Sequence, residues 1–255
     1  MKIKTYLTTE SYNEEESTQD SIFVYIDVLR ASTTVCTALY AGAKEVIPIE
    51  SMDKAIDLHQ KLSKETSILA GERKDIKPIG FALGNSPAEF TAAIVKNKTI
   101  VLTTTNGTKA FQKGKNSNHR IVASFVNLSI VASNIQKILD EENIKFCNII
   151  CSGNNGCFSF EDTLCAGSII QRLTGEIPGI KMNDSTIASK DIYSLYKDRL
   201  SIFIKSCEHS KVLIDLGLEN DINEAVTIDK YLVLPEITDN SIKLTAVNLL
   251  EGDNK

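Results

Sequence analysis

The sequence contains no tryptophan, only five prolines and only three histidines among its 255 residues. So few prolines exclude a proline-rich or collagen-like chain. An excess of positive charge is missing too, because 33 acidic residues outnumber 28 basic ones and give a formal net charge of -5. A basic stripe for duplex nucleic acid is therefore not expected, and an anionic ligand would have to be met by local charge.

Long apolar runs are also missing. Residues 1–20 contain no apolar segment of signal-peptide length, and no later stretch is long enough for a transmembrane helix. We therefore expect a cytoplasmic protein that does not insert into a membrane. Its six cysteines form no CxxC pair, which argues against a zinc ribbon and favours reduced thiols.

The remaining composition is that of a soluble globular protein, since 42% of the residues are hydrophobic and 24% are charged. A chain of this size fits either one domain over residues 1–255 or two closely packed lobes. Residues 73–90 contain Pro78, Gly80, Gly84 and Pro87 without periodicity, and they predict a long ordered loop or a bridge between lobes.

Short β-rich runs alternate with amphipathic helical patterns, which is typical of an α/β layered fold with a largely parallel sheet. The predicted strands are 22–29, 45–50, 67–72, 99–105, 120–125 and 145–153. Helices are predicted after Arg30, Asn106 and Asp162, and over 52–64 and 127–143. Residues 184–218 predict two further helices, and 230–248 predict two short strands around a turn at Asp239–Asn240.

Two predicted strands end in an acidic residue followed by an arginine. The pairs are Asp27 with Arg30, and Glu72 with Arg73. In open α/β sheets ligands bind beyond the carboxyl ends of the strands, where such pairs can hold a metal ion and an anion side by side. The alternative is that Asp27 caps the next helix and Arg30 forms a surface ion pair.

Two other segments have the polar residues of an anion or cation site. Thr103–Thr108 runs from a strand through hydroxyl groups and Asn-Gly into a helix, which suits an oxyanion site but is also an ordinary helix start. Glu161 and Asp162 are adjacent carboxylates before an apolar helix, and carboxylates are typical Mg²⁺ ligands. Acidic residues are equally favoured there by the helix dipole.

Arginine is scarce and histidine falls elsewhere. Only five arginines accompany 23 lysines, and two of the five follow acids at predicted strand exits. His59, His119 and His209 lie outside all four polar segments, so we interpret them as surface or structural residues. Cys147 and Cys151 would point to one face of a strand and are expected in the core.

Four blocks, taken in order, resemble the 2-phosphosulfolactate phosphatase (ComB) family. They read IDVLRASTT, LAGERKDIKPIGFALGNSPAEF, IVLTTTNGTKAF and CSGNNGCFSFEDTLCAG, and the match is dense over residues 22–173. The resemblance implies a three-layer α/β/α fold with a mixed sheet. It also implies a Mg²⁺-dependent hydrolysis of 2-phospho-3-sulfolactate to 3-sulfolactate and phosphate, a step toward coenzyme M.

Carried over by position, the resemblance assigns catalysis to Asp27 and Arg30. The implied metal ligands are Asp27, Glu72, Glu161 and Asp162, and the implied substrate-binding residues are Arg30, Arg73, Asn85, Ser86, Thr104, Thr105, Asn106, Gly107 and Thr108. The sequence departs from the family pattern at Ala82, where an acid is expected, and at Lys109, where arginine is frequent. The expected substrate is a small phosphorylated polyanion, and the expected assembly is a homodimer.

Other functions remain open on the sequence. A haloacid-dehalogenase-type phosphatase needs a second acid two positions after Asp27, where Leu29 stands, so that mechanism is excluded. An isochorismatase-like cysteine hydrolase would use Cys151 as its nucleophile, without a metal. A non-catalytic anion-binding protein would keep the arginines but would not need the acids.

Overall fold

The structure is a computed structural model that describes residues 1–13, 19–177 and 179–245. In this part of the chain ten strands form one sheet, in the order β4-β5-β3-β10-β9-β6-β2-β7-β1-β8. The strands are β1 (Lys2–Tyr6), β2 (Ser21–Ile26), β3 (Glu45–Pro48), β4 (Ser67–Gly71), β5 (Thr99–Thr103), β6 (His119–Ala123), β7 (Phe146–Cys151), β8 (Lys181–Met182), β9 (Pro235–Thr238) and β10 (Ser241–Leu244). The helices are α1 (Ala31–Tyr40), α2 (Met52–Lys61), α3 (Ala92–Val95), α4 (Gly107–Ala110), α5 (Leu128–Glu141), α6 (Phe160–Glu176), α7 (Asp184–Tyr196), α8 (Leu200–Ser206), α9 (Glu208–Asp215) and α10 (Glu219–Ala225).

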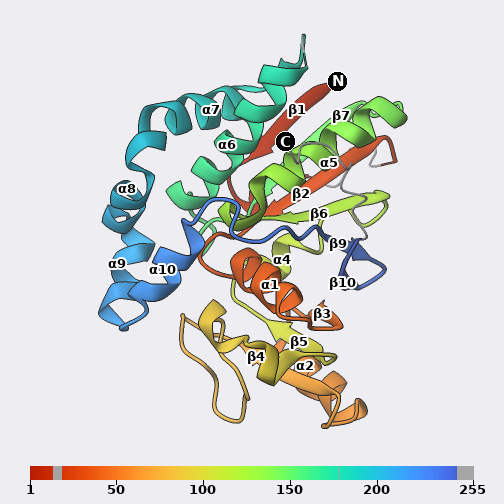
Figure 1. The fold of residues 1–255 in the computed structure, drawn as a ribbon, viewed down its shortest axis with the longest axis vertical. Coiled ribbons are helices and arrows are strands. Elements are labelled where there is room, and N and C mark those ends of the chain that lie inside the picture. The colour runs from red at the N-terminus through yellow and green to blue at the C-terminus, as the bar shows by residue number, and fades with distance from the viewer. Residues whose placement is uncertain (14–18, 178, 246–255) are drawn as a thin grey trace, which may run out of the picture.

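The sheet consists of two parallel blocks that run in opposite directions. Strands β6, β2, β7, β1 and β8 pair in parallel in the first block, and β3, β5 and β4 do so in the second. The β9–β10 hairpin joins the blocks, because β6 pairs antiparallel with β9, β9 with β10, and β10 with β3. Figure 1 shows the first block in the upper part of the molecule and the second below it.

The central strand β2 is apolar on both faces, as expected of a strand covered on both sides. Ile22, Val24 and Ile26 pack into the core formed with α5 and α6, whereas Phe23 and Tyr25 pack into the core formed with α1. Helix α1 is buried over its first nine residues because it also contacts the second block. Helix α2 covers the other face of β4 and β5. The fold is thus a three-layer α/β/α arrangement with a mixed sheet, as the sequence predicts.

The six strands predicted between residues 22 and 153 are all present, and so is the hairpin predicted around Asp239–Asn240. The prediction of two helices over 184–218 is wrong, because this segment forms α7, α8 and α9. Strands β1 and β8 were not predicted, because β1 reads KIKTY and alternates half-buried lysines with buried residues, and β8 has only two residues at the edge of the sheet. The last two strands were predicted over residues 230–248. Of this segment, residues 246–248 lie outside the described residues.

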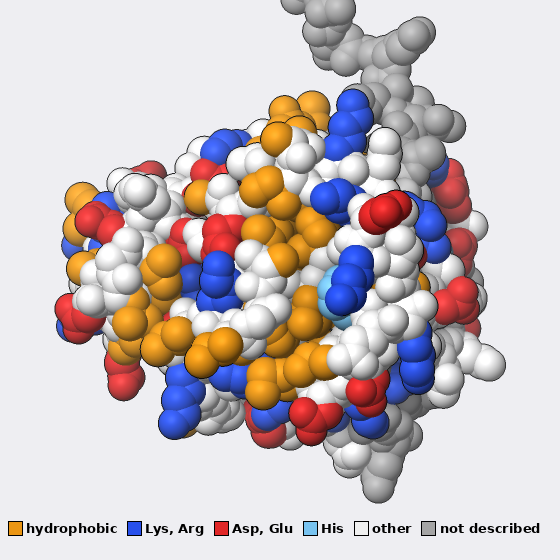
Figure 2. Space-filling model, turned by 90° about the horizontal axis from the view of Figure 1, so that it is seen from below, with side chains coloured by type: hydrophobic (Ala, Val, Ile, Leu, Met, Phe, Trp, Pro, Cys, Tyr) orange, Lys and Arg blue, Asp and Glu red, His pale blue; other side chains and the backbone are white. Residues whose placement is uncertain are grey.

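The surface of the described residues is mixed in character. Figure 2 shows the face near α2 and the loop after β4, where hydrophobic patches lie between basic and acidic side chains. Charge of both signs is interspersed on this face, so it offers no single-sign field for a polyelectrolyte. Among the helices that the structure describes, none combines the length and apolar character needed to cross a bilayer.

Two glycines of α6 provide a test of how tightly α6 packs on α7. A Cβ at Gly167 would lie 2.1 Å from the carbonyl oxygen of Ser189, whereas a Cβ at Gly175 would meet nothing within 4 Å. We expect Gly167→Ala to lower the free energy of unfolding by about 1–3 kcal/mol through overpacking. Gly175→Ala should instead be neutral or stabilise by up to about 1 kcal/mol, because alanine is the better helix former. Urea unfolding of both variants measures the difference, and equal effects would contradict the close helix contact.

Candidate active site

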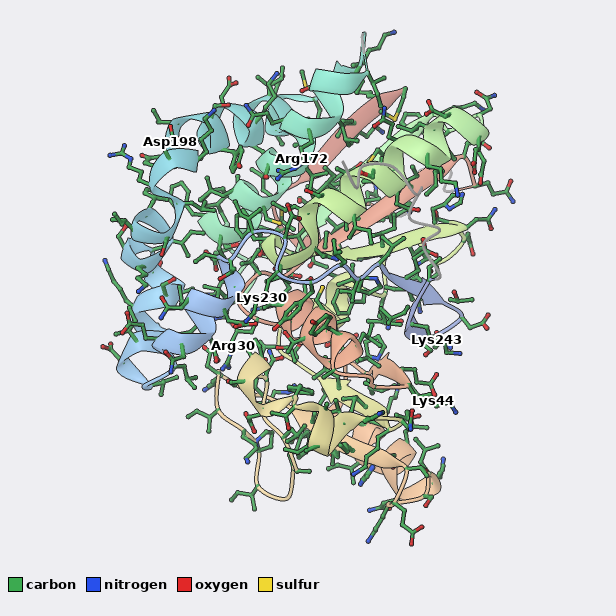
Figure 3. The ribbon with its side chains drawn as sticks, in the orientation of Figure 1. Arg30, Lys44, Arg172, Asp198, Lys230 and Lys243 are labelled. Atoms are coloured by element: carbon green, nitrogen blue, oxygen red, sulfur yellow. The ribbon has the colours of Figure 1, made fainter. Side chains whose placement is uncertain are left out.

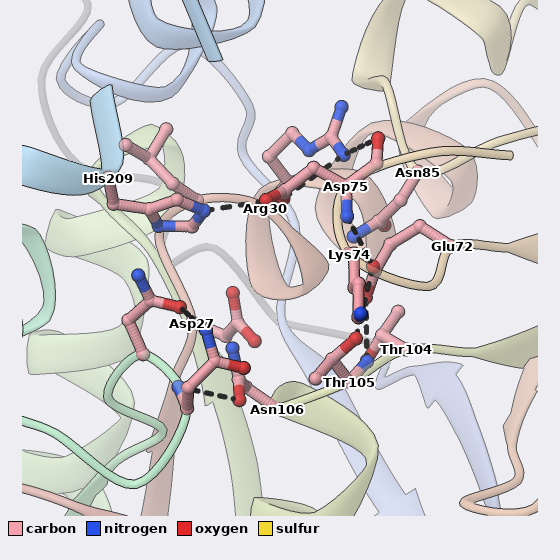
Figure 4. Close-up of a pocket in the computed structure, with 13 residues that line it drawn as sticks. Asp27, Arg30, Glu72, Lys74, Asp75, Asn85, Thr104, Thr105, Asn106 and His209 are labelled. Atoms are coloured by element: carbon pink, nitrogen blue, oxygen red, sulfur yellow. Dashed lines mark hydrogen bonds and ion pairs between the residues drawn. The ribbon is translucent and has the colours of Figure 1, made fainter. Parts of the chain in front are cut away.

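The polar segments singled out in the sequence converge on one cleft between the two blocks of the sheet. The cleft holds about 20 Å³ of space and is bordered by residues that follow β2, β4, β5 and β7, together with a residue of α9 (Figure 4). Residues that follow strands of the first block, β2 and β7, thus meet residues that follow strands of the second block, β4 and β5. Its lining comprises Asp27, Leu29, Arg30, Glu72, Lys74, Asp75, Asn85, Thr104, Thr105, Asn106, Asn154, Asn155 and His209.

Asp27 is buried at the end of β2 and uses its two carboxylate oxygens differently. Oδ1 accepts a hydrogen bond from the backbone N–H of Ala31 at 3.0 Å, so Asp27 does cap α1. Oδ2 lies against Gly107, where a Cβ would approach it to 2.6 Å. Burial, and then the charges of Glu72 and Glu161, raise the pKa of Asp27 to about 7, although Ala31 and His209 act in the opposite direction. A raised pKa in a cleft makes Asp27 a candidate functional carboxylate as well as a cap of α1.

Glu72 joins the loops that follow β4 and β5. Its Oε1 accepts the backbone N–H of Thr105 at 2.6 Å, and its Oε2 accepts the Thr105 hydroxyl at 3.1 Å and the backbone N–H of Asp75 at 2.9 Å. Donors thus occupy both carboxylate oxygens. Glu72 therefore orients Thr105 and Asp75 at the edge of the cleft.

Asp162 connects the ends of β2 and β7 from the first turn of α6. Its Oδ1 accepts the backbone N–H of Val28 at 2.8 Å, and its Oδ2 accepts that of Gly153 at 3.0 Å. Burial raises the pKa of Asp162 well above its usual value, and the charges of Asp27 and Glu161 add to this effect. The carboxylates that the sequence assigned to metal binding therefore lie close enough to repel one another.

His209 on α9 is a cleft residue that the sequence reasoning placed outside the site. The ring is buried, with Nδ1 3.1 Å from Glu161 Oε1 and Nε2 3.3 Å from Asp75 Oδ1. Burial opposes the charged ring, but the hydrogen bonds to these two carboxylates raise the pKa of His209 to about 10. The ring is thus a cation between two anions. The sequence analysis missed His209 because it is 134 residues from Asp75 in the chain.

Arg30 and Arg73 differ in what they contact. Arg30, labelled in Figures 3 and 4, lines the cleft. Its guanidinium forms ion pairs with Asp221 at 2.8 Å and with Asp75 at 3.5 Å. The guanidinium of Arg73 donates to the backbone oxygens of Glu72 and Glu50 and to the Thr103 hydroxyl, and it is not part of the cleft lining. The cation next to it in the sequence, Lys74, does line the cleft.

The other residues named from the sequence divide into lining and supporting positions. Asn85, Thr104, Thr105 and Asn106 line the cleft, and the buried Oδ1 of Asn85 has no hydrogen-bond partner in the described structure. Thr108 supports Thr104, since its backbone N–H donates to Thr104 Oγ1 at 3.1 Å and its hydroxyl donates to the Thr104 carbonyl at 2.8 Å. The named residues outside the lining are Arg73, Ser86, Gly107, Thr108, Glu161 and Asp162.

A larger hollow of about 470 Å³ adjoins the cleft and shares Asn154, Asn155 and His209 with it. Phe158, Phe160 and other uncharged residues line much of this hollow, and its lining includes Glu161 and Glu208 but neither lysine nor arginine. Charge therefore favours the smaller cleft for the anionic groups of a ligand, because Arg30 and Lys74 lie there.

Cys151, the nucleophile of the cysteine-hydrolase alternative, lies in the core with Cys147 as predicted. Burial raises the pKa of the Cys151 thiol well above its ordinary value, and the neighbouring Asp162 adds to this. A reactive cysteine needs an accessible thiol with a lowered pKa. Cys151 is instead inaccessible and its thiol has a raised pKa, so this environment does not support a nucleophilic cysteine.

The donor set of the cleft fits a hard cation. No group of three His, Cys, Asp or Glu side chains is gathered into a ready metal cluster within the described residues. Among the carboxylates in and next to the cleft that the structure describes, Asp27, Asp75 and Glu161 each use one oxygen in a printed contact and keep the other for a ligand. Mg²⁺ typically takes one or two carboxylates and completes its shell with water and substrate phosphate. Asp27 and Glu161 would be the residues implied by the resemblance that have an oxygen for such an ion, and Glu72 and Asp162 hold the neighbouring loops.

Comparison with known proteins places the chain among phosphatases. The profile of the family described as 2-phosphosulpholactate phosphatase matches residues 6–240. A protein of Caldanaerobacter subterraneus subsp. tengcongensis is 37% identical over 243 residues, which cover 95% of this chain and 98% of the other. A protein of Thermotoga maritima is 40% identical over 214 residues, which cover 84% of this chain and 88% of the relative. A protein of Clostridium beijerinckii is 34% identical over 244 residues, which cover 95% of this chain and 99% of the relative. Each is named a probable 2-phosphosulfolactate phosphatase.

The approach of α4 to Asp27 requires glycine at position 107. A Cβ there would lie 2.5 Å from the Ala31 side chain and 2.6 Å from Asp27 Oδ2. We expect Gly107→Ala to displace the Asp27 carboxylate and to lower the free energy of unfolding by about 1–3 kcal/mol. Unfolding of this variant is compared with that of Gly175→Ala, which meets no neighbour. If the two variants were equally stable, Asp27 and α4 would not be packed as described.

Proposed function

The chain belongs to the 2-phosphosulfolactate phosphatase family, and from this premise we propose that it is a Mg²⁺-dependent phosphatase acting in the cytoplasm. The proposed reaction is hydrolysis of 2-phospho-3-sulfolactate, or of a closely related 2-phospho acid, to 3-sulfolactate and phosphate. This is the type of step that leads toward coenzyme M. All six cysteines are free thiols, which supports a reducing compartment.

The charge balance of the cleft is the observation that carries the proposal. The carboxylates in and around it are Asp27, Glu72, Asp75, Glu161, Asp162 and Asp221, and the cationic groups are Arg30, Lys74 and His209. The acids thus outnumber the cations, and the raised pKa values of Asp27 and Asp162 reflect the cost of keeping these acids ionised together without a further cation. A bound divalent cation removes this conflict, which supports the dependence on Mg²⁺.

The residues of the chain would divide the work between binding and chemistry. Lys74 and Arg30 would hold the anionic groups of the substrate, and the amide of Asn85 would supply a polar contact. Asp27 would act as metal ligand or nucleophile through Oδ2, and Glu161 would be a second ligand whose other oxygen is held by His209. When bound, Mg²⁺ would stabilise the charge that develops on the phosphoryl oxygens.

Phosphate release with and without Mg²⁺ tests the proposed function. We expect the protein to release phosphate from 2-phosphosulfolactate, phospholactate or phosphoglycolate at millimolar Mg²⁺, and we expect EDTA to abolish the release because the cleft acids then repel the substrate. Thiol alkylation should have little effect, since Cys151 is buried. Metal-independent release that alkylation abolishes would favour the cysteine hydrolase, and binding without release would favour an anion-binding protein.

Asp27→Asn separates a catalytic carboxylate from a helix cap. Asparagine keeps an acceptor for the Ala31 N–H and relieves the burial of a charge, so the melting temperature should not fall. The initial rate of phosphate release should nevertheless drop on the order of 10³-fold or more, as for loss of a catalytic group. Asp53→Asn, in the exposed first turn of α2, is the control and should retain full activity. An Asp27→Asn enzyme within about threefold of wild type would rule out a catalytic role.

A further inference from the structure

Asp221 on α10 is a buried carboxylate that contacts the cleft from the C-terminal part of the chain. It is 2% exposed, and each of its oxygens accepts one hydrogen bond. Oδ2 accepts from Nη1 of Arg30 at 2.8 Å, and Oδ1 accepts from the hydroxyl of Ser86 at 2.5 Å. One side chain of α10 therefore holds both the start of α1 and the loop before α3.

These contacts determine which donor of Arg30 is left for a ligand. Nη1 is engaged by Asp221, and Nη2 donates to the backbone oxygen of Asp75 at 3.0 Å. Nε is buried and has no partner among the described residues. Arg30 is thus fixed through its two terminal nitrogens, and Nε is its one nitrogen without a partner among the described residues, in a side chain that lines the cleft.

The second contact of Asp221 fixes the other side of the same region. Ser86 follows Asn85 directly, and the backbone oxygen of Asn85 accepts the Thr34 hydroxyl of α1 at 2.8 Å. The buried Oδ1 of Asn85 has no partner, so the cleft holds an unpaired acceptor as well as an unpaired donor. Buried polar atoms without partners are costly unless a ligand or water meets them.

We propose that Asp221 is a positioning residue for substrate binding, which orients the Arg30 guanidinium toward the anionic substrate and, through Ser86, holds the amide of Asn85, whose Nδ2 group is the part that can donate to an anionic oxygen; this rests on the proposed function. The surrounding charges explain why Asp221 is needed. Asp27 and Glu72 line the same cleft as Arg30, and Asp75 Oδ1 already lies 3.5 Å from Nη2 of Arg30, so carboxylates other than Asp221 can attract a freed guanidinium. Without the charge of Asp221, Arg30 turns toward these carboxylates and no longer presents its unused donor to the substrate.

The test is Asp221→Asn, with Asp229→Asn as a matched control. Asp229 also faces an arginine and a serine, with Arg172 Nη2 at 3.8 Å and Ser129 Oγ at 2.6 Å, but it is not part of the cleft lining. We expect Asp221→Asn to raise KM by about tenfold or more, because misplaced binding groups weaken substrate binding. The dissociation constant for inorganic phosphate, measured by calorimetry, should rise by about the same factor. The value of kcat should stay within about threefold of wild type. Asp229→Asn should change neither constant.

A double variant shows whether Asp221 acts through Arg30. In an Arg30→Lys background, the guanidinium that Asp221 orients is absent, so adding Asp221→Asn should raise KM by less than about twofold. An unchanged or lower KM for the single Asp221→Asn variant would overturn the proposal, because it would mean that Asp221 only neutralises Arg30. If Asp221→Asn does not fold, Ser86→Ala replaces it, since it removes one of the two contacts and should still raise KM measurably.

The same measurements distinguish failure of this inference from failure of the proposed function. A wild-type protein that releases no phosphate from any 2-phospho acid contradicts the phosphatase assignment. Binding of inorganic phosphate that Asp221→Asn weakens still supports the positioning role in that case. Failure of wild type to bind inorganic phosphate at all contradicts both.

Discussion

The mutual repulsion of buried carboxylates is the constraint on which the site depends. Asp27, Glu161 and Asp162 come from the ends of β2 and the start of α6, and their burial and proximity raise the pKa values of Asp27 and Asp162. Such a group of acids would not persist in a core without compensation. The compensation visible in the structure comes from backbone N–H donors to Asp162 and from the imidazole of His209 beside Glu161.

The architecture explains how these groups come together. In a flat sheet, two parallel blocks of opposite direction would place their strand ends on opposite edges. Here the β9–β10 hairpin links the blocks through short antiparallel pairings, and α1 lies buried in contact with both. The polar residues that follow β2 and β7 thereby meet those that follow β4 and β5. Glu72 then connects the two loops of the second block through Thr105 and Asp75.

Much of this was predictable from the sequence, because the acids, hydroxyls and amides stand next to apolar runs that form strands. Asp27 and Thr105 were placed correctly at strand exits for this reason. His209 and Asp221 were not, since α9 and α10 follow a helical segment whose packing on the cleft leaves no local pattern. Adjacent residues also took unexpected roles: Lys74 lines the cleft, whereas Arg73 binds backbone oxygens.

The late helices therefore do more than cover the sheet. Asp221 neutralises and holds Arg30, and His209 stands between Asp75 and Glu161, so α9 and α10 supply one anion and one cation to a cleft formed by earlier strands. Removing either group would leave a buried charge without its partner, which is costlier than never having had the pair. The C-terminal helices are thus coupled electrostatically to the residues that follow β2 and β4, through the Asp221–Arg30 pair and through the contacts of His209 with Asp75 and Glu161.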